Sequence, residues 1–260
     1  MKRLMLMIKH YGSLSKMFRE HARGFIYLMF HPYWLRRLVI RELLYGRRYN
    51  NKLEWIKWQI FDAYTSTPQH GSEISYRRPV NYARIRIIAD MIKSLGSNMV
   101  LDVGCGDGAI GKAVEKVGAE VTSTELPLIA MMAKKRYGVS TVIACDAENL
   151  PFCNETFDMV LASELVEHLW SPQKFIEEAY RVIRNKGHLI IATPEGPESL
   201  RYDAHKHYFT VEILEKMLNG KFALKQVEKL GPICAPTSTI ILLFQKIENS
   251  TMPAHNVKTD

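Results

Sequence analysis

Cysteine is scarce in this chain and widely spaced. The 260 residues contain four cysteines, Cys105, Cys145, Cys153 and Cys234. They form no C-x-x-C pair, and none stands at metal-ligand spacing from a histidine. We therefore expect neither a disulfide framework nor a zinc site, and we predict no metal ligands. This cysteine usage fits the reducing environment of the cytoplasm.

Long apolar runs are absent as well. No stretch approaches the ~18 uncharged apolar residues of a membrane-spanning helix. The first residues, MKRLMLMIKHYG, carry a charge pair, but their apolar stretch ends at Lys9 and is too short for the hydrophobic region of a signal peptide. Internal repeats and low-complexity tracts are also missing. We expect a globular protein that is not integral to a bilayer.

Acidic residues are rare in the first fifty positions. Residues 1–50 hold 11 Lys/Arg and 2 Asp/Glu, a net charge of +9, whereas the whole chain has +8, so the other 210 residues sum to about −1. The same region is predicted to form helix in several pieces. In LRRLVIRELLYGRR the helical period places Leu35, Leu38, Val39 and Leu43 on one stripe and the arginines Arg36, Arg37 and Arg41 elsewhere. A polar, breaker-rich linker over residues 65–79 separates it from a second expected helix over residues 80–95.

From Met99 onward, short apolar runs alternate with helical or loop segments. The runs lie near Met99–Val103, Ala119–Thr124, Thr141–Ala144, Phe157–Ala162 and His188–Thr193. Strand–helix alternation of this kind predicts a doubly wound, mostly parallel sheet of the α/β class. The last two stretches, FALKQVEKLG and STIILLFQKIE, are separated only by a loop and predict a terminal antiparallel hairpin.

Glycines cluster directly behind the first of these strands. In MVLDVGCGDGAIG, Gly104, Gly106 and Gly108 stand between the strand and a helix. Glycine permits a sharp turn and lets a ligand approach backbone N–H groups that a Cβ would shield. The glycines are also compatible with a turn that is merely tight, and together with Ala109 they satisfy the G-x-G-x-x-A pattern of a dinucleotide site.

Acidic residues follow the next two strands. Glu125 ends the second apolar run, 21 residues after Gly104, where a carboxylate can accept hydrogen bonds from both ribose hydroxyls of a nucleotide. Asp146 follows the third run. Each acid alone could be a helix cap or a solvated loop residue. The ordered series of glycine turn, acid and acid along one sheet edge predicts a nucleotide-type ligand.

Six segments carry a resemblance to a known family. They are VLDVGCGDG, TSTEL, CDAENLPF, FDMVLASELVEHL, RVIRNKGHLIIATP and HKHYFT, within a match from about residue 80 to residue 247. The chain resembles the class I S-adenosylmethionine-dependent methyltransferases, in the small-molecule branch similar to enzymes of ubiquinone and menaquinone biosynthesis. The resemblance implies a Rossmann-like, seven-stranded sheet with an antiparallel last strand. We expect this domain at residues 79–248, after a basic helical extension (1–78) and before a flexible tail (249–260).

The resemblance also implies which residues bind S-adenosylmethionine. These residues are Asp102, Gly104, Cys105, Gly106, Glu125, Leu126, Asp146, Ala147 and Ser163. Asp102 and the two glycines would surround the methionine moiety, and Glu125 would meet the ribose. Asp146 would meet the adenine amino group, and Ser163 would lie beneath the sulfonium.

Two clusters could supply a general base for an acceptor hydroxyl or acidic carbon, for which histidine suits neutral pH. The first is Glu164, Glu167 and His168, where the resembling family carries E-x-x-E-H beside the cofactor. These residues could instead only cap and pack the turn that follows. The second is DAHKHYFT, in which His205 or His207 could deprotonate or orient the acceptor.

The second cluster also has a structural interpretation. Thr210 is a good N-cap for the helical segment VEILEKML, so one of the two preceding histidines is expected to be structural. The candidate catalytic residues are therefore His168, His205 and His207.

The expected reaction is methyl transfer to an oxygen or carbon of a small-molecule acceptor, lipid-like or glycan-like. No Asn-Pro-Pro-Tyr-like segment follows the fourth strand, which argues against the base-amine and glutamine N-methylation that uses it. The alternatives are RNA methylation, a binding module that kept the cofactor site but lost the acceptor pocket, and a nicotinamide-dependent oxidoreductase.

Three interpretations compete for the basic N-terminal region. It could be a helical cap over the cofactor cleft, with Trp55, Trp58, Phe61 and Tyr64 buried. It could contact a membrane surface, because Leu, Met, Phe and Trp are interleaved with Arg. Nucleic-acid binding is the least favoured, since no recognisable RNA-binding module accompanies the charge.

Overall fold

The chain divides into two units, residues 1–61 and 62–260, and the computed structural model describes residues 51–60, 79–139, 141–201, 204–231 and 238–248. In the first unit the described part is a helix over residues 52–60, whose start is capped by Asn51 Oδ1 accepting from the Glu54 N–H at 3.0 Å. Trp55 and Trp58 are buried. The rest of the predicted N-terminal extension, including Phe61 and Tyr64, lies outside the described residues, as do residues 65–78 of the predicted linker and the predicted tail. The predicted domain boundaries therefore stay predictions.

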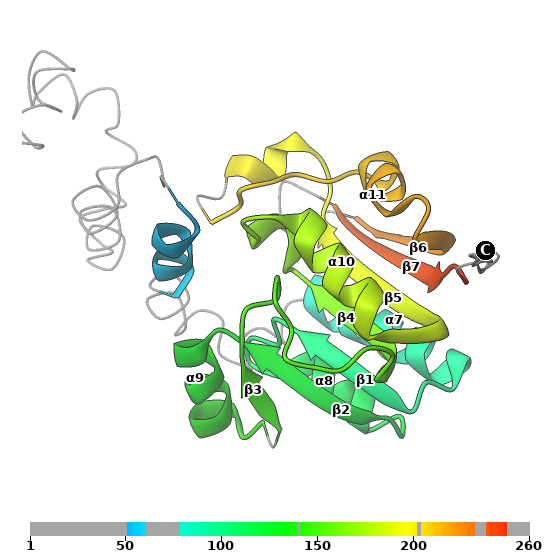
Figure 1. Ribbon diagram of the computed structural model, residues 1–260, viewed down its shortest axis with the longest axis horizontal. Helices are drawn as coiled ribbons and strands as arrows, with labels where there is room; N and C mark the ends of the chain where they lie inside the picture. The colour runs from blue at the N-terminus through cyan, green and yellow to red at the C-terminus, as the bar shows by residue number, and fades with distance from the viewer. Residues whose placement is uncertain (1–50, 61–78, 140, 202–203, 232–237, 249–260) are drawn as a thin grey trace, which may run out of the picture. The chain divides into compact units, whose positions relative to one another are not determined.

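The second unit is built around one seven-stranded sheet (Figure 1). Its strands are β1 Met99–Val103, β2 Glu120–Glu125, β3 Val142–Ala144, β4 Phe157–Ser163, β5 Ile183–Pro194, β6 Phe222–Leu230 and β7 Thr239–Lys246, in the order β3-β2-β1-β4-β5-β7-β6. Neighbouring strands are parallel except that β7 is antiparallel to both β5 and β6. The predicted mostly parallel sheet, its antiparallel last strand and the terminal hairpin are confirmed.

One strand is longer than the sequence indicates. β5 begins at Ile183 rather than near His188, and a bulge separates its pairing with Phe157 from its pairing with Met159. Lys186, in the added part, has a positive φ of 63°. The bulge and the charged residues around it interrupt the apolar pattern by which a strand is recognised, so the periodicity misses this part.

Helices precede β1 and lie between most of the strands that follow. They are α7 Pro79–Leu95, α8 Ala109–Glu115, α9 Pro127–Tyr137, α10 Pro172–Val182 and α11 Val211–Leu218, with the short 3₁₀ turns η2 Val166–His168 and η3 Pro197–Arg201. Pro127 and Pro172 open their helices, where the missing N–H costs no hydrogen bond. Thr210 caps α11 as predicted, since its Oγ1 accepts from the Ile213 N–H at 3.3 Å.

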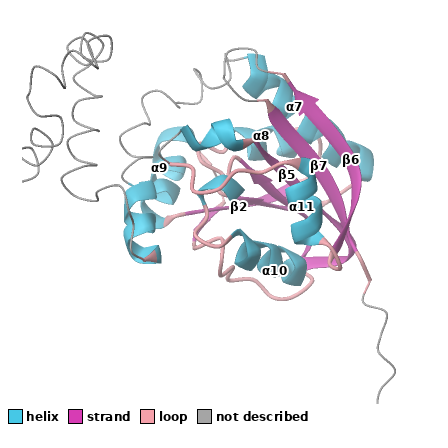
Figure 2. Cartoon of the chain, turned by 90° about the horizontal axis from the view of Figure 1, so that it is seen from above, coloured by secondary structure: helices cyan, strands magenta, loops and turns pink. Residues whose placement is uncertain are grey.

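Both faces of the sheet are covered (Figure 2). Phe175 of α10 and Leu214 of α11 pack with Leu101 of β1 on one face, while Ile88 of α7 and Val114 of α8 pack on the other. Ligands of such sheets bind outside the carboxyl ends of the strands. Within the described part of the chain, no helix combines the length and apolar character that crossing a bilayer demands.

Candidate active site

The predicted cofactor-binding residues follow strands that end at one edge of the sheet. Val103 of β1 pairs with Thr124 of β2 and with Ala162 of β4, and Glu125 pairs with Ala144 of β3. These four strands therefore end level with one another. The turns behind β1, β2, β3 and β4 meet at the same carboxyl edge, as the sequence predicts.

The glycine turn behind β1 presents main chain. Gly104, Gly106 and Gly108 have φ between 53° and 72°, a backbone conformation that residues with a side chain seldom adopt. The N–H groups of Gly104 and Cys105 both donate to the Thr124 carbonyl, at 2.9 and 3.0 Å. These bonds fix the turn to the end of β2.

The three glycines differ in their surroundings. A Cβ at Gly104 would lie 2.8 Å from Leu165 Cδ1, and one at Gly108 would collide with Val139. A Cβ at Gly106 would meet nothing within 4 Å. A Cβ would therefore clash with the stiff Val139 side chain at Gly108 and would displace the end of the Leu165 side chain at Gly104, whereas Gly106 borders open space in which a ligand could approach the main chain.

Glu125 reaches back from the tip of β2 to this turn. Its Oε2 accepts from the Gly106 N–H at 3.1 Å, and its Oε1 accepts from the Leu126 N–H at 2.7 Å. Burial raises the pKa of Glu125, and these two N–H donors oppose the rise. The carboxylate is thus fixed by main chain, and its other lone pairs suit hydroxyl donors such as those of a ribose.

Asp102 lies near the end of β1 and is 2% exposed. Its Oδ2 has no hydrogen-bond partner among the described residues. Burial raises the pKa of Asp102 to about 7, with further increases from Glu125 and Asp107, while a hydrogen bond from the Gly111 backbone opposes the shift. A buried acid with an unsatisfied oxygen and a shifted pKa is typical of a ligand-binding site.

Cys105 and Asp146 take different places. The Cys105 side chain lies in an apolar cluster with Ala133 and Val139, and burial raises the pKa of its thiol. Only its main chain is therefore available to a ligand at the turn. Asp146 follows β3, and its Oδ1 accepts from the Glu148 N–H at 3.0 Å.

The turn behind β3 is tied to Glu125. The Cys145 N–H donates to the Glu125 carbonyl at 2.9 Å, which places the Asp146 turn beside the tip of β2. Ala147 is partly buried against the main core. Leu126 follows Glu125 directly and is the N-cap residue of α9.

Behind β4 the chain forms a polar turn. Ser163 ends the strand, and its buried Oγ has no hydrogen-bond partner in the described ranges. Glu164 has a φ of 54°, and its N–H donates to the Ala192 carbonyl of β5 at 2.8 Å. The 3₁₀ turn η2 follows directly and carries Glu167 and His168.

Glu167 is almost fully buried, at 1% exposure. Its Oε2 accepts from the Thr193 hydroxyl at 2.9 Å, whereas its buried Oε1 has no hydrogen-bond partner within the part of the chain that is described. Burial raises the pKa of Glu167 well above its ordinary value, and the charge of Glu164 raises it further. Thr193 and Arg84 oppose the rise.

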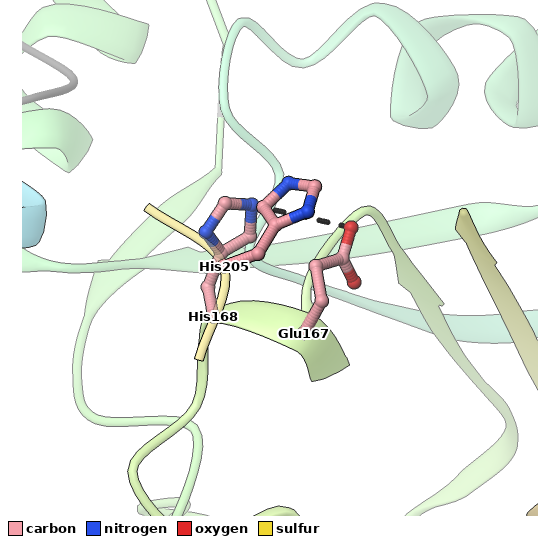
Figure 3. A group of neighbouring side chains, drawn as sticks. All are labelled: Glu167, His168 and His205. Atoms are coloured by element: carbon pink, nitrogen blue, oxygen red, sulfur yellow. Dashed lines mark ion pairs between the residues drawn. The ribbon is translucent and has the colours of Figure 1, made fainter. Parts of the chain in front are cut away.

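His168 and His205 converge on Glu167 (Figure 3). Donor atoms of the three residues lie within 4.8 Å of one another, and the two imidazole rings meet edge to face with centroids 4.8 Å apart. His168 Nδ1 lies 2.8 Å from the Ala204 carbonyl, so Nδ1 carries the proton in the neutral ring and Nε2 is the basic nitrogen. That Nε2 is 4.0 Å from Glu167 Oε1.

Burial and the neighbouring His168 lower the pKa of His205 to about 4, so His205 is neutral at pH 7. We call Glu167, His168 and His205 the acid–histidine cluster. One carboxylate and two imidazoles can take a proton from a hydroxyl. The same donor set could hold a divalent cation such as zinc. The spacing along the sequence does not show it, because His205 joins His168 only through the fold.

His207 lies outside the acid–histidine cluster. Its Nε2 is 3.1 Å from the Leu169 carbonyl, and burial together with Lys206 lowers the pKa of its ring. The N–H groups of Lys206 and His207 donate to the Glu167 carbonyl at 2.8 and 3.2 Å. The structure therefore brings together two of the three candidate histidines.

Sequence reasoning missed two side chains at this edge, Arg84 and Thr193. Arg84 Nη1 pairs with Glu164 Oε1 at 2.6 Å, and Thr193 donates to Glu167. A signal for Arg84 was present: it stands four residues before Ile88 on α7, which places a charge on the core-facing stripe of a helix. Thr193 was hidden within the apolar run of its strand.

These features define a class of protein: a Rossmann-like domain that offers a nucleotide-type cofactor an open main-chain turn and a fixed acid, beside an acid–histidine cluster. A family model described as "Methyltransferase domain" matches residues 101–191. The chain is 24% identical over 172 residues to Ubiquinone biosynthesis O-methyltransferase of Photobacterium profundum, covering 64% of this chain and 70% of that protein. It is 31% identical over 152 residues to an uncharacterized protein of Methanocaldococcus jannaschii, covering 57% and 71%.

A solved structure has the same fold. It is 1,6-didemethyltoxoflavin-N1-methyltransferase of Burkholderia thailandensis with bound 1,6-didemethyltoxoflavin and S-adenosylhomocysteine, at a TM-score of 0.62 and 18% identity, covering 77% of this chain and 92% of that one. The chain belongs to the class I S-adenosylmethionine-dependent methyltransferases. Its matches span from 35% to 71% of the curated relatives' own lengths.

Proposed function

We propose that this enzyme methylates a hydroxyl oxygen of a small molecule at the carboxyl ends of β4 and β5. The observation that carries the proposal is Glu167 Oε1, which is buried beside two histidines and has no hydrogen-bond partner among the described residues. A hydroxyl would donate its proton to this oxygen, whereas a carbon acceptor offers no such hydrogen bond. The relatives whose name contains "O-methyltransferase" support an oxygen acceptor.

The residues predicted from the sequence are our proposal for the cofactor site. The open side of Gly106 leaves room for the methionine moiety along the main chain of Gly104 and Cys105, near the buried Asp102. S-adenosylmethionine supplies an electrophilic methyl group when it is bound. The cofactor contacts proposed beyond this turn are Glu125 and Leu126 at the ribose, Asp146 and Ala147 at the adenine, and Ser163 beneath the sulfonium.

The chain's own groups would align the acceptor and take its proton. His205, neutral at pH 7, can accept a proton, and Glu167, whose pKa is raised, can hold one. Thr193 fixes the Glu167 carboxylate, and the Ala204 carbonyl fixes the tautomer of His168. Because the cofactor provides the reactive group, alignment of the acceptor is the main task of these residues.

The proposal extends to a lipid-like acceptor. Residues 1–50 carry a net charge of +9 and interleave Arg with Leu, Met, Phe and Trp. A segment of this composition favours the surface of an anionic membrane, where a lipid-like acceptor is found. RNA methylation is the competing outcome, since the same charge would also attract phosphates.

The test is transfer of radiolabelled methyl from S-adenosylmethionine to fractionated native lipid, polar-metabolite and RNA extracts. Label in the lipid fraction, located on oxygen by mass spectrometry, supports the proposal. Glu167→Gln keeps the size of the side chain and should remove at least about 90% of the transfer, because a neutral amide is a poor proton acceptor. The exposed Glu198→Gln is the matched control and should leave transfer unchanged.

Three outcomes contradict the proposal. Label on a carbon atom would overturn the oxygen assignment. Label in RNA alone would establish the competing substrate. Intact cofactor binding with no label in any fraction would indicate a binding module without an acceptor pocket.

A further inference from the structure

An ion pair links α7 to the turn behind β4. Arg84 Nη1 lies 2.6 Å from Glu164 Oε1, and the two side chains are 14% and 34% exposed. Charges that are partly removed from water interact more strongly than a surface pair does. The pair joins segments 80 positions apart in the sequence at the edge where the acid–histidine cluster lies.

Arg84 lies on α7, a helix that packs against the core. Ile85, the next residue, is buried, and Ile88 and Ile92 belong to the core beneath the sheet. The Nε of Arg84 is buried and has no hydrogen-bond partner in the described part of the chain, and its Nη1 forms the ion pair with Glu164. Any movement of Glu164 therefore has to break a contact with a well-anchored partner.

Glu164 needs such a partner because its backbone is unfavourable. A φ of 54° is uncommon for a residue that carries a side chain, and it is energetically unfavourable. A conformation of this kind persists only where the surroundings enforce it. Here the Ala192 carbonyl holds the Glu164 N–H, and Arg84 holds the carboxylate. The turn so fixed leads directly into η2, which carries Glu167 and His168.

The ion pair also acts on the charge of the cluster. The pKa of Glu167 is raised by Glu164 and lowered by Arg84, and the pKa of His205 is raised by Glu164. A neutral residue in place of Arg84 would leave two neighbouring carboxylates without a cation between α7 and η2. Both the geometry of the ion pair and the charges around the acid–histidine cluster therefore indicate that Arg84 affects this cluster.

We propose that Arg84 is a positioning residue of the acceptor site, which acts through its ion pair with Glu164 to fix the turn that presents Glu167 and His168. Its effect on methyl transfer rests on the proposed function. Its effect on the two histidines does not depend on the proposed function. An experiment can therefore contradict the role of Arg84 and the proposed function separately.

The first test is spectroscopic and needs no turnover. Side-chain ¹⁵N chemical shifts of His168 and His205 are measured by NMR in the full chain, with assignments from single His→Gln variants. Arg84→Gln and Glu164→Gln should each change the shifts of both rings, and Arg84→Lys should restore most of the wild-type pattern. Arg86→Gln is the matched control, because Arg86 is on the same helix, 72% exposed and paired with Asp90 at 3.7 Å.

The second test is kinetic, with the extract fraction that takes labelled methyl as acceptor. Arg84→Gln should lower kcat about tenfold or more, because small displacements of catalytic groups are costly, while the KM for acceptor and the Kd for S-adenosylmethionine stay within about twofold. The double variant Arg84→Gln/Glu164→Gln should be no slower than either single variant.

Wild-type histidine shifts in Arg84→Gln would overturn the proposal, as would effects of the two variants that simply multiply. If Arg84→Gln does not fold, Glu164→Gln alone decides, since its side chain is partly exposed and unaltered shifts in it would equally refute the assignment. If no fraction takes label, the proposed function fails, and the spectroscopic test still stands.

Discussion

At the scale of single residues, the glycine turn separates packing from ligand binding. Gly106 and Gly108 both have positive φ, so alanine at either position carries a similar backbone cost. Only at Gly108 does the added Cβ also collide with a neighbour, Val139. A pair of alanine variants can therefore distinguish the two roles.

We expect Gly106→Ala to weaken S-adenosylmethionine binding about tenfold or more, which is ~1.4 kcal/mol, because its Cβ would occupy space beside the main chain where the cofactor approaches. Gly108→Ala should instead lower the free energy of unfolding by about 1–3 kcal/mol more than Gly106→Ala does. Calorimetric titration and thermal unfolding measure the two effects. Cofactor affinity in Gly106→Ala equal to that of the wild type would remove the methionine moiety from this turn.

Glu125 offers a second residue-scale prediction. Glu125→Ala should weaken S-adenosylmethionine affinity by about 1–3 kcal/mol, since hydrogen bonds from ribose hydroxyls to a charged acceptor would be lost. Glu120→Ala is the matched control, because Glu120 is exposed at the other end of the same strand. Equal titration curves for the Glu125 and Glu120 variants would place the ribose elsewhere.

Asp102 predicts a pH dependence of stability. Its pKa is raised by burial to about 7, whereas in the unfolded chain it is near 3.8, so between these values the folded protein holds a proton that the unfolded chain has released. Well below pH 3.8 Asp102 is protonated in both the folded and the unfolded chain and does not change the free energy of unfolding. As the pH rises to 7, Asp102 lowers the free energy of unfolding by up to about 4 kcal/mol. Asp102→Asn should remove this decline.

The measurement compares Tm of the cofactor-free variant and wild type from pH 5 to pH 8. The variant should gain stability relative to wild type as pH rises. Asp158→Asn is the contrasting control: burial acts to raise the pKa of Asp158, but hydrogen bonds from the Met99 N–H and Arg184 outweigh it and lower that pKa. Parallel Tm curves for wild type and Asp102→Asn would show that Asp102 stays ionised in the fold.

At the scale of elements, α10 anchors the segment that follows Asp146. Arg181 donates to the Leu150 carbonyl at 2.9 Å, to the Phe152 carbonyl at 2.6 Å and to Asn154 Oδ1 at 3.1 Å, while Glu178 accepts from the Leu150 N–H at 2.7 Å. One turn of the helix thus satisfies the main chain of a loop without regular structure.

Arg181→Ala should lower the free energy of unfolding by about 2 kcal/mol, because it leaves carbonyl groups of a partly buried loop without donors. In a chain of this size that is a fall of roughly 4–8 °C in Tm. Lys174→Ala, on the exposed side of the same helix, should change Tm little. Similar Tm values for the two variants would mean that the loop is held by its apolar contacts alone.

The helices and strands also show how much of the fold can be predicted from the sequence. The central strands and the terminal hairpin follow from apolar runs, because a parallel sheet covered on both faces needs continuous apolar segments. The start of β5 does not follow, since its bulge and charged residues break that pattern. In the site, the glycine turn and Glu125 are set by local order along the chain, whereas His205 meets His168, and Arg84 meets Glu164, only when distant segments pack.

At the scale of the whole molecule, charge is divided unevenly between N-terminal region and methyltransferase domain. Residues 1–50 hold a net +9, and the other 210 residues are close to neutral. Such a basic segment attracts an anionic lipid surface over a distance set by salt, about 8 Å at physiological ionic strength. The lipid-like acceptor that we propose would be encountered at that surface.

We expect the full chain to sediment with vesicles that contain phosphatidylglycerol and to remain in solution with vesicles of phosphatidylcholine alone. Binding should fall steeply between about 0.05 and 0.5 M salt, because the Debye length shortens about threefold over that range. Replacing Arg36, Arg37 and Arg41 by Gln should weaken binding, since each basic residue near the surface contributes about 1 kcal/mol. Lys134→Gln/Lys135→Gln, which removes two exposed charges from α9, is the control and should bind as the wild type does.

If the amount of protein that sediments is the same at all salt concentrations, apolar side chains rather than charge cause the attraction. Absence of binding at every lipid composition would leave the basic region without a membrane role and would favour a cap over the cofactor cleft.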